Sequence, residues 1–530
     1  QVLGNKTAQG NFMHRILQLS MLCGTGVLSV PALAANQDTQ GPEELRLAQA
    51  PTNPVDSVPP AADRPAELAP APAATQPSTA AAAGQATTGQ TGTAQQTEVE
   101  QERTAAPTSP PLRPEVMVDA AAPPKPVVGD VSLHGYFRIG WGMSSEKGRQ
   151  VCFQVAGAMS KFRLGNECEQ YGEFHFAAPM YVAKDGTVAN VHFMPAVYIP
   201  TSRVGYPGAI NSNAGETWNG ASWGFPFLYM DVQNMPGLSG GTAWVGRRYY
   251  KREDWNATDF FYWNPSGLGA GIEDIHIGEE LRFSYAAFTV DPPAVAPPVA
   301  TPWLPSIVPQ NSVGIRNDFQ LRGIRLYPGG ELQLGANVVA NWSDNPATHG
   351  GWGGLVRHVQ DVANGNNKLA VQYGRGAGVG FGIPDAPTAD SKTSRLRIVD
   401  VLTIDPVDWF GAQAGFVYQH DKMTGGSQDW ISAGLRSSFA FSEHGKVVLD
   451  IGHDNVKPSD GPRRTLTKFT LAPTLSAGRG VMTRPELRLF CTVAMWNAAA
   501  RAAGVDSEGI YTNTDKKVGA TFGVHSEVWW

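Results

Sequence analysis

The most regular feature of the chain is a series of segments, beginning near residue 130, in which apolar and polar side chains alternate. In SLHGYFRIGW (132–141), Ile139 and Trp141 fall on one face of an extended strand and Arg138 falls on the other. The same alternation recurs in ELQLGANVVANW, DWISAGLRSSFAF and KVVLDIGHD, and turn sequences such as YPGGE separate these segments. The pattern predicts an all-β region built of many antiparallel strands.

Alternation alone fits a soluble β-sandwich as well as a membrane barrel. Two observations favour the barrel. The apolar faces persist over many strands without helical segments to cover them, and the chain finishes on aromatic side chains, as is usual where a barrel closes in an outer membrane. We therefore predict a transmembrane antiparallel β-barrel of about 18 strands with long external loops. The soluble alternative is a secreted β-rich carbohydrate-binding protein or glycosidase.

The last strand-like segment, ATFGVHSEVWW, ends in two tryptophans whose side chains point in opposite directions. Trp530 belongs to the apolar series and is predicted to face lipid. Trp529 belongs to the mixed polar series and is predicted to face the lumen. The same parity places Tyr136, Tyr171 and Trp430 on the lumen side.

The chain divides into three regions of different composition, and the last of them is predicted to form the barrel. Residues 13–35 combine basic side chains, an apolar stretch and small residues, and this pattern predicts a secretory signal peptide. Residues 36–128 contain no aromatic residue and are rich in Pro, Ala, Thr and Gln. Such a segment buries too little apolar surface to offset its ordering entropy, so we predict a disordered linker. Residues 129–530 are predicted to form the barrel.

Charge and cysteine content narrow the function classes. The net charge of −6 and the absence of a basic patch argue against a nucleic-acid partner. No run of 18 apolar residues exists beyond the N-terminal region, which argues against a membrane protein built of helices. Cys152 and Cys168 lie sixteen residues apart in a chain predicted to be exported, where a disulfide is permitted. Closing that loop would stabilise the fold by roughly 3 kcal/mol.

The sequence contains only a weak match to a catalytic motif. The segment GLSGG (237–241) matches the G-x-S-x-G pattern of serine hydrolases, but an alternating strand follows it, whereas a nucleophile elbow requires a helix. We predict a turn there. The sequence has no P-loop, no H-E-x-x-H pair and no CxxC, and no carboxylate pair is placed by spacing as in a glycosidase. We expect neither an enzyme nor a cofactor, and the sequence leaves bound metal ions open.

Several ordered segments nevertheless resemble one family. HGYFRIGWG, CFQVAGAMSKFRLGNECEQYGEF, PGLSGGTAWVGRRYYKREDWNATDFFYWNPSGLGAGIEDI, SRLRIVD, IGHDNV and the final EVWW resemble maltoporins, including the sucrose-porin branch. Maltoporins are trimeric, 18-stranded, sugar-specific porins of Gram-negative outer membranes. The resemblance covers residues 130–530 and implies a homotrimer in contact with outer-membrane lipid.

The resemblance also implies roles for individual residues. Sugar rings slide along pore aromatics, and the matching positions are Tyr136, Tyr171, Trp430 and Trp529. Ionised polar-track residues flank them, and the matching positions are Arg138, Arg163, Glu173, Arg252 and Asp259. Cys152 and Cys168 match a disulfide of the first external loop. A second-loop tryptophan that reaches the neighbouring channel matches Trp218 or Trp223.

The chain departs from the family at several pore positions. Phe261 stands where maltoporins have the constriction tyrosine, Asn256 replaces a polar-track histidine, and a slide phenylalanine is matched by Asn317. The resemblance therefore implies passive, selective diffusion of sugars such as maltose, maltodextrin or another oligosaccharide. A general, non-specific porin is the alternative that these departures favour.

Overall fold

The computed structural model describes residues 131–146, 148–200, 222–290, 313–383 and 385–530. The predicted signal peptide (13–35), the predicted linker (36–128) and Trp218 lie outside the described residues. Within the described ranges, no helix is long and apolar enough to cross a bilayer.

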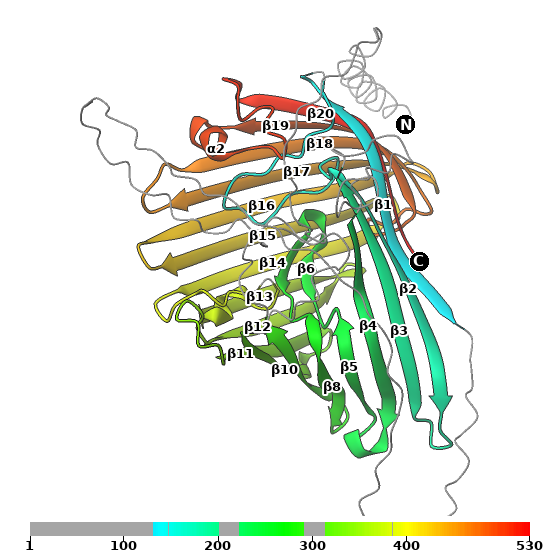
Figure 1. The fold of residues 1–530 in the computed structure, drawn as a ribbon. Coiled ribbons are helices and arrows are strands. Elements are labelled where there is room, and N and C mark those ends of the chain that lie inside the picture. The colour runs from blue at the N-terminus through cyan, green and yellow to red at the C-terminus, as the bar shows by residue number, and fades with distance from the viewer. Residues whose placement is uncertain (1–130, 147, 201–221, 291–312, 384) are drawn as a thin grey trace, which may run out of the picture. The chain divides into compact units, whose positions relative to one another are not determined.

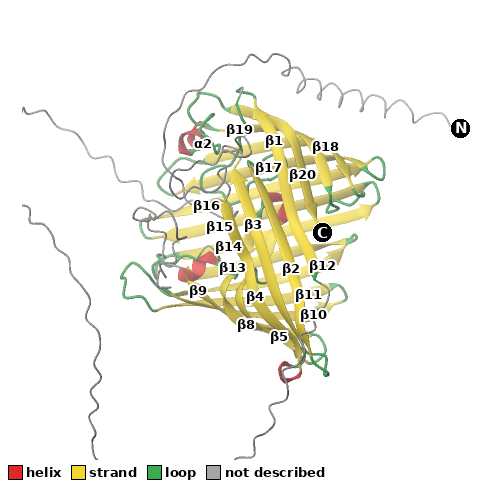
Figure 2. Cartoon of the chain, turned by 45° about the vertical axis from the view of Figure 1, so that its right-hand side comes forward, coloured by secondary structure: helices red, strands yellow, loops and turns green. Residues whose placement is uncertain are grey.

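Eighteen strands form one closed antiparallel sheet, in which each strand pairs with the next and β1 pairs with β20 (Figures 1 and 2). This confirms the predicted barrel. The strands are β1 (Ser132–Ser144), β2 (Glu169–Val182), β3 (Val188–Pro200), β4 (Ser222–Met235), β5 (Gly241–Arg248), β8 (Gly267–Ile277), β9 (Leu281–Val290), β10 (Gly314–Tyr327), β11 (Gly330–Asn341), β12 (Gly351–Val362), β13 (Gly365–Gly376), β14 (Ser394–Val407), β15 (Phe410–Met423), β16 (Gly426–Ala440), β17 (Gly445–Pro458), β18 (Arg464–Ser476), β19 (Glu486–Trp496) and β20 (Val518–Trp529).

The two faces of the sheet follow the predicted alternation. On β1, Trp141 is 65% exposed on the outer face, whereas the inward Arg138 is 3% exposed. On β16, Leu435 is exposed on the outer face and the adjacent Arg436 is buried inside. A closed sheet satisfies every backbone hydrogen bond between its own strands, so an outward apolar face is compatible with a lipid environment.

The two ends of the barrel differ in the length of their connections. Short turns join strands at one end, such as the two residues 328–329 between β10 and β11, where Gly329 adopts a φ of 75°. The GLSGG segment lies in another of these turns. It contains the end of the 3-10 helix η3 (Pro236–Leu238) and leads directly into β5, which confirms the turn. Long loops occupy the other end, which faces the cell exterior in bacterial barrels.

Two of the long loops fold into the barrel. The β1–β2 loop (residues 145–168) is closed by a disulfide between Cys152 and Cys168, with a Cα–Cα distance of 5.8 Å, which confirms that pairing. The β5–β8 loop (residues 249–266) carries the small hairpin of β6 (Glu253–Trp255) and β7 (Phe260–Trp263), with the 3-10 helix η4 (Asn256–Thr258) between them (Figure 1). Apolar side chains of both loops join wall residues of β12 to β19 in one buried cluster.

Glycines in the wall make room for the rings of these loops. Phe162 of the β1–β2 loop lies over Gly434 and Gly452, where an added Cβ would be 2.1 Å and 2.4 Å from atoms of its ring. Trp255 of the β5–β8 loop lies over Gly415, where an added Cβ would be 2.3 Å from the indole. The two loop rings meet edge to face at 5.6 Å. The loops therefore fill one side of the lumen.

A charge on the outer face tests the assignment of that face to lipid. Leu435→Arg, near the middle of β16, is expected to destabilise the folded barrel by about 2–4 kcal/mol, because arginine on the lipid face is costly near the bilayer midplane. Urea titration of the protein folded in liposomes measures this loss. Leu435→Met is the matched control and should fold like the wild type. An unchanged titration for the arginine variant would contradict the lipid-facing assignment.

Candidate permeation site

Three aromatic side chains form a row on the inner face of adjacent strands. Trp529 of β20 and Tyr136 of β1 are direct partners in the register, and their rings are stacked, with centroids 6.5 Å apart and planes inclined by 19°. Tyr171 of β2 continues the row at 6.1 Å from Tyr136. Trp530 lies on the opposite face, 45% exposed, with its ring 6.1 Å from that of Phe174. The two terminal tryptophans thus separate by parity as predicted.

Trp430 occupies a different environment from these three residues. Its parity is inward, as predicted, but the side chain is 0% exposed. Phe260 of the β5–β8 loop packs edge to face on it at 5.2 Å, and its Nε1 donates a hydrogen bond to Asp454 at 3.3 Å. The structure therefore does not place Trp430 beside an open path, because the inward loops cover that part of the wall.

Two further matched positions face outward. Trp223 of β4 is 54% exposed on the outer face, on the same side as Phe225. Asn317 of β10 accepts a hydrogen bond from the outward Tyr285 at 2.8 Å, while its neighbours Arg316 and Asp318 are buried inside. The match of Asn317 to a pore aromatic is therefore wrong, because odd-numbered positions in this part of β10 face away from the lumen.

Two of the three predicted polar-track arginines, Arg138 and Arg163, are engaged in buried ion pairs. Arg138 contacts Glu167 at 2.8 Å and also pairs with Glu169. Arg163 contacts the same Glu167 at 2.8 Å and Glu527 at 2.8 Å. These contacts belong to a continuous series of alternating charges, here named the charge ladder, which comprises Asp259, Lys161, Glu169, Arg138, Glu167, Arg163, Glu527, Arg484, Arg488, Glu486 and Lys446.

The charge ladder joins the two inward loops to the wall. Asp259, which follows η4, contacts Lys161 of the β1–β2 loop at 3.2 Å and Arg138 of β1 at 3.8 Å. Burial opposes ionisation of Asp259, but the positive charges of Lys161, Arg163 and Arg138 lower the pKa of its carboxyl below the usual value. Asp259 therefore stays ionised at neutral pH and bridges both loops to the wall.

Arg252 and Phe261 face the aromatic row from the β5–β8 loop. The guanidinium of Arg252 lies between two rings, 3.5 Å from the centroid of Tyr249 and 4.7 Å from that of Phe261. No carboxylate of the described residues lies within ion-pair distance of Arg252. Stacking on both ring faces holds the planar cation in place, so its N–H groups remain available to a molecule in the lumen.

Glu173 connects the aromatic row to the β5–β8 loop. It accepts a hydrogen bond from the hydroxyl of Tyr249 at 2.6 Å and another from the hydroxyl of Tyr171. Tyr249 thus links the aromatic row, Glu173 and Arg252.

Sequence reasoning missed Tyr249 and the ladder carboxylates Glu167, Glu169, Glu486 and Glu527. The alternation in ELRLF and HSEVW predicts that Glu486 and Glu527 face inward, but it does not indicate which cations they pair with.

A family model for the LamB porin matches residues 131–530. The chain belongs to the LamB porin family. The chain is also similar to solved structures at low identity. OccAB1 of Acinetobacter baumannii is 9% identical, with 77% of this chain and 98% of that chain covered and a TM-score of 0.43. OmpF of Salmonella typhi, in complex with daunomycin, is 10% identical, with 75% and 97% covered and a TM-score of 0.39.

Membership of this family, together with the closed 18-stranded barrel, makes the protein a multi-pass β-barrel channel of the outer membrane. It is a porin. Among the described residues of this porin, no group of three or more His, Cys, Asp or Glu side chains is arranged to hold a metal ion.

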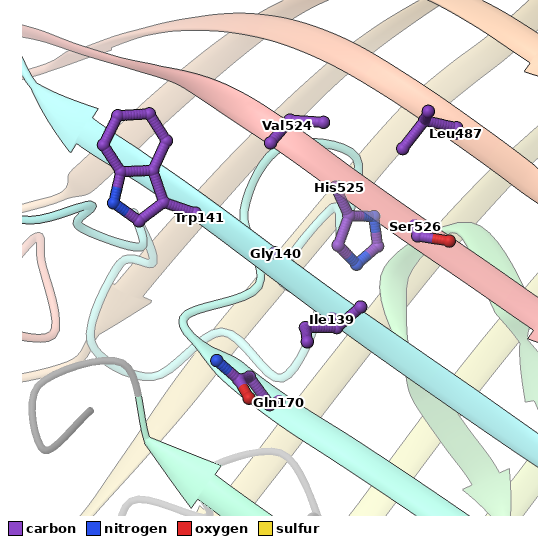
Figure 3. Close-up of a pocket in the computed structure, with 8 residues that line it drawn as sticks. All are labelled: Ile139, Gly140, Trp141, Gln170, Leu487, Val524, His525 and Ser526. Carbon is purple, nitrogen blue, oxygen red and sulfur yellow. The ribbon is translucent and has the colours of Figure 1, made fainter. Parts of the chain in front are cut away.

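A hollow of about 250 Å³ lies on the outer side of the seam between β1 and β20 (Figure 3). Outward side chains border it, including Trp141 and Val524, while His525 belongs to the inner face and contacts Glu167 at 3.1 Å. The hollow is mostly apolar and opens toward lipid. It is therefore separate from the permeation site of this porin.

Removing one carboxylate of the charge ladder is expected to change both stability and ion selectivity. Glu527 is 1% exposed and contacts Arg163, Arg484 and Arg488. Glu527→Gln leaves these cations under-compensated, which typically costs 3–5 kcal/mol, so we expect about that loss in urea titrations.

The same variant should shift the reversal potential in a KCl gradient toward anion preference, because the lumen gains a net positive charge. Asp515→Asn is the control, since Asp515 is fully exposed and pairs only with Arg501 in the described structure. Wild-type stability and selectivity in Glu527→Gln would show that the charge ladder does not shape this channel.

Proposed function

We propose that this porin is a passive channel selective for sugars. The observation that carries the proposal is the row of Trp529, Tyr136 and Tyr171, with an unpaired guanidinium and a carboxylate facing it. Flat aromatic faces stack on the apolar faces of pyranose rings, and the row offers adjacent surfaces of this kind. Arg252 supplies donors and Glu173 supplies acceptors for sugar hydroxyls.

Transport by such a site follows the concentration gradient. Each stacking or hydrogen-bonding contact is weak, so a sugar exchanges one set of contacts for the next as it moves. The charge ladder contributes indirectly, since its arginines hold the loops that narrow the lumen. Maltose, maltodextrin or another oligosaccharide is the proposed substrate class.

A general porin is the second candidate. The burial of Trp430 under Phe260 favours it, because the row is then limited to three strands, and Tyr171 within it is only 7% exposed. Phe261 also lacks the hydroxyl that a tyrosine would offer at the constriction. A general porin would pass sugars at rates set by size alone, without saturable block of ion current.

We further propose that the mature protein is a homotrimer in the outer membrane, with residues 13–35 removed and residues 36–128 as a disordered linker. The outward Trp223 fits a contact with a neighbouring subunit or with lipid, and Trp218 remains the other candidate for the second-loop role. An SDS-resistant, heat-modifiable band of trimer mass in outer-membrane fractions is the expected result. Monomeric migration under all conditions would exclude the trimer.

The stacking role is tested at the two terminal tryptophans. Trp529→Ala is expected to keep the ion conductance close to that of the wild type and to weaken sugar block of the current by roughly tenfold, since a lost stacking contact costs about 1–1.5 kcal/mol. Sugar-dependent current noise in planar bilayers, measured over a panel of mono- and disaccharides, provides the affinities.

Trp530→Phe is the matched control, because it changes the adjacent residue on the lipid side and keeps a terminal aromatic. Its sugar block should equal that of the wild type. Unchanged block in Trp529→Ala would remove the stacking role. A wild-type channel with no saturable block by any sugar would favour the general porin.

A further inference from the structure

Away from the aromatic row, histidines and an aspartate cross the inner face of four neighbouring strands. His134 of β1 and His175 of β2 are direct partners in the register. The rings of His175 and His192, on β3, are stacked with centroids 5.3 Å apart. Asp231 of β4 lies next to His192. His192 is the fifth residue of β3 after a short turn, so this group lies in the half of the barrel nearest the short turns.

Two imidazole nitrogens in this group lie at a distance that suits a shared ligand. His175 Nε2 is 3.0 Å from His192 Nδ1, and His192 Nε2 is 3.1 Å from Asp231 Oδ2. With Asp231 accepting the Nε2–H of His192, the Nδ1 of His192 carries a lone pair. A tetrahedral Zn²⁺ bound at 2.0–2.1 Å holds two ligand nitrogens about 3.3 Å apart. A small widening of the contact, together with a turn of the rings away from their present head-on alignment, therefore accommodates an ion between them.

Asp231 holds His192 in this orientation. Its carboxylate accepts hydrogen bonds from Asn190 at 2.8 Å and from Gln233 at 3.2 Å. The imidazole of His192 lies flat against the ring of Tyr229, with centroids 4.2 Å apart and planes inclined by 1°. A carboxylate bonded to the second nitrogen of a histidine is the arrangement that orients metal-binding imidazoles.

One negative charge lies beside the pair of histidines. It is the carboxylate of Asp231, which is bonded to His192. The guanidinium of Arg248 lies 4.7 Å from the centroid of the Tyr229 ring and is itself paired with Glu273 at 2.7 Å. His192 is 7% exposed and His175 is half-buried on the inner face. An ion in the lumen can therefore reach His175 first.

We propose that His175 and His192 form a two-nitrogen binding site for a divalent transition ion such as Zn²⁺, Ni²⁺ or Cu²⁺, with Asp231 as a positioning residue. Imidazole nitrogen suits these ions. The ion replaces the hydrogen bond between the rings, and the proton of His175 moves from Nε2 to Nδ1, so no net proton is released. Water fills the remaining coordination positions, since the ring of His134 lies 6.1 Å from that of His175 and is not a ligand.

An ion bound there adds positive charge to the channel wall and should reduce its conductance. In planar bilayers containing the full-length protein, added ZnCl₂ is expected to lower the current, and EDTA is expected to restore it. His175→Gln and His192→Gln should each require roughly tenfold more Zn²⁺ for the same reduction. His453→Gln is the control, because His453 lies on the outer face and hydrogen-bonds Thr467 at 2.8 Å.

Two further measurements separate metal binding from a structural effect. Asp231→Asn keeps the side-chain shape and should weaken Zn²⁺ block by roughly tenfold. Electron paramagnetic resonance of Cu²⁺ added to the wild type should show coupling to two imidazole nitrogens, and His175→Gln should lose one. The spectrum of the wild type decides the question even where a variant fails to fold.

The proposal fails if the wild type shows neither Zn²⁺ block nor nitrogen coupling, or if the double variant of His175 and His192 retains the wild-type response. It does not rest on sugar selectivity. A channel without sugar block that is still inhibited by Zn²⁺ would contradict the proposed function alone.

Discussion

The placement of the β1–β2 loop inside the barrel depends on the ion pairs of Glu527. This carboxylate, buried on β20, contacts Arg163 of the β1–β2 loop, Arg484 before β19 and Arg488 within β19. A buried charge is tolerated only when it is paired, so these positions constrain one another. The same contacts fix the inward loop against the seam of the barrel. The position of the inward loop is therefore set by electrostatic pairing at the seam together with its apolar packing on the wall.

The barrel and the direction of most side chains could be predicted from the sequence because parity is a local property. Alternation assigned Trp529 to the lumen and Trp530 to the outer face, and the structure agrees. Parity also assigned Trp430 to the inner face correctly, but it carries no information about which inner residues a distant loop covers. Phe260 lies 170 residues away in sequence, and its packing on Trp430 is a long-range contact.

The residues of the permeation site could be predicted only in part, because parity is local and does not report long-range contacts. The match of Asn317 failed because a shift of one residue moves a side chain to the other face of a strand. Parity assigned Arg138 to the inner face, and Arg163 was matched only by resemblance. Glu167 lies four residues from Arg163 in the same loop, but the pairs Arg138–Glu167 and Arg163–Glu527 join distant segments that no spacing in the sequence links. Residue type and parity predicted which groups line the lumen. Tertiary contacts decide which of them remain open to a passing molecule.

The contact of the Phe162 ring with the barrel wall has a consequence for the order in which the barrel folds. The ring rests on Gly434 of β16 and Gly452 of β17, which are register partners on neighbouring strands. The surface that receives the ring is formed by two neighbouring strands, so it does not exist until those strands have paired. The β1–β2 loop precedes both strands in the chain, but it can dock only after they have formed. The final diameter of the pore is thus a late property of the folded barrel, acquired after its wall is complete.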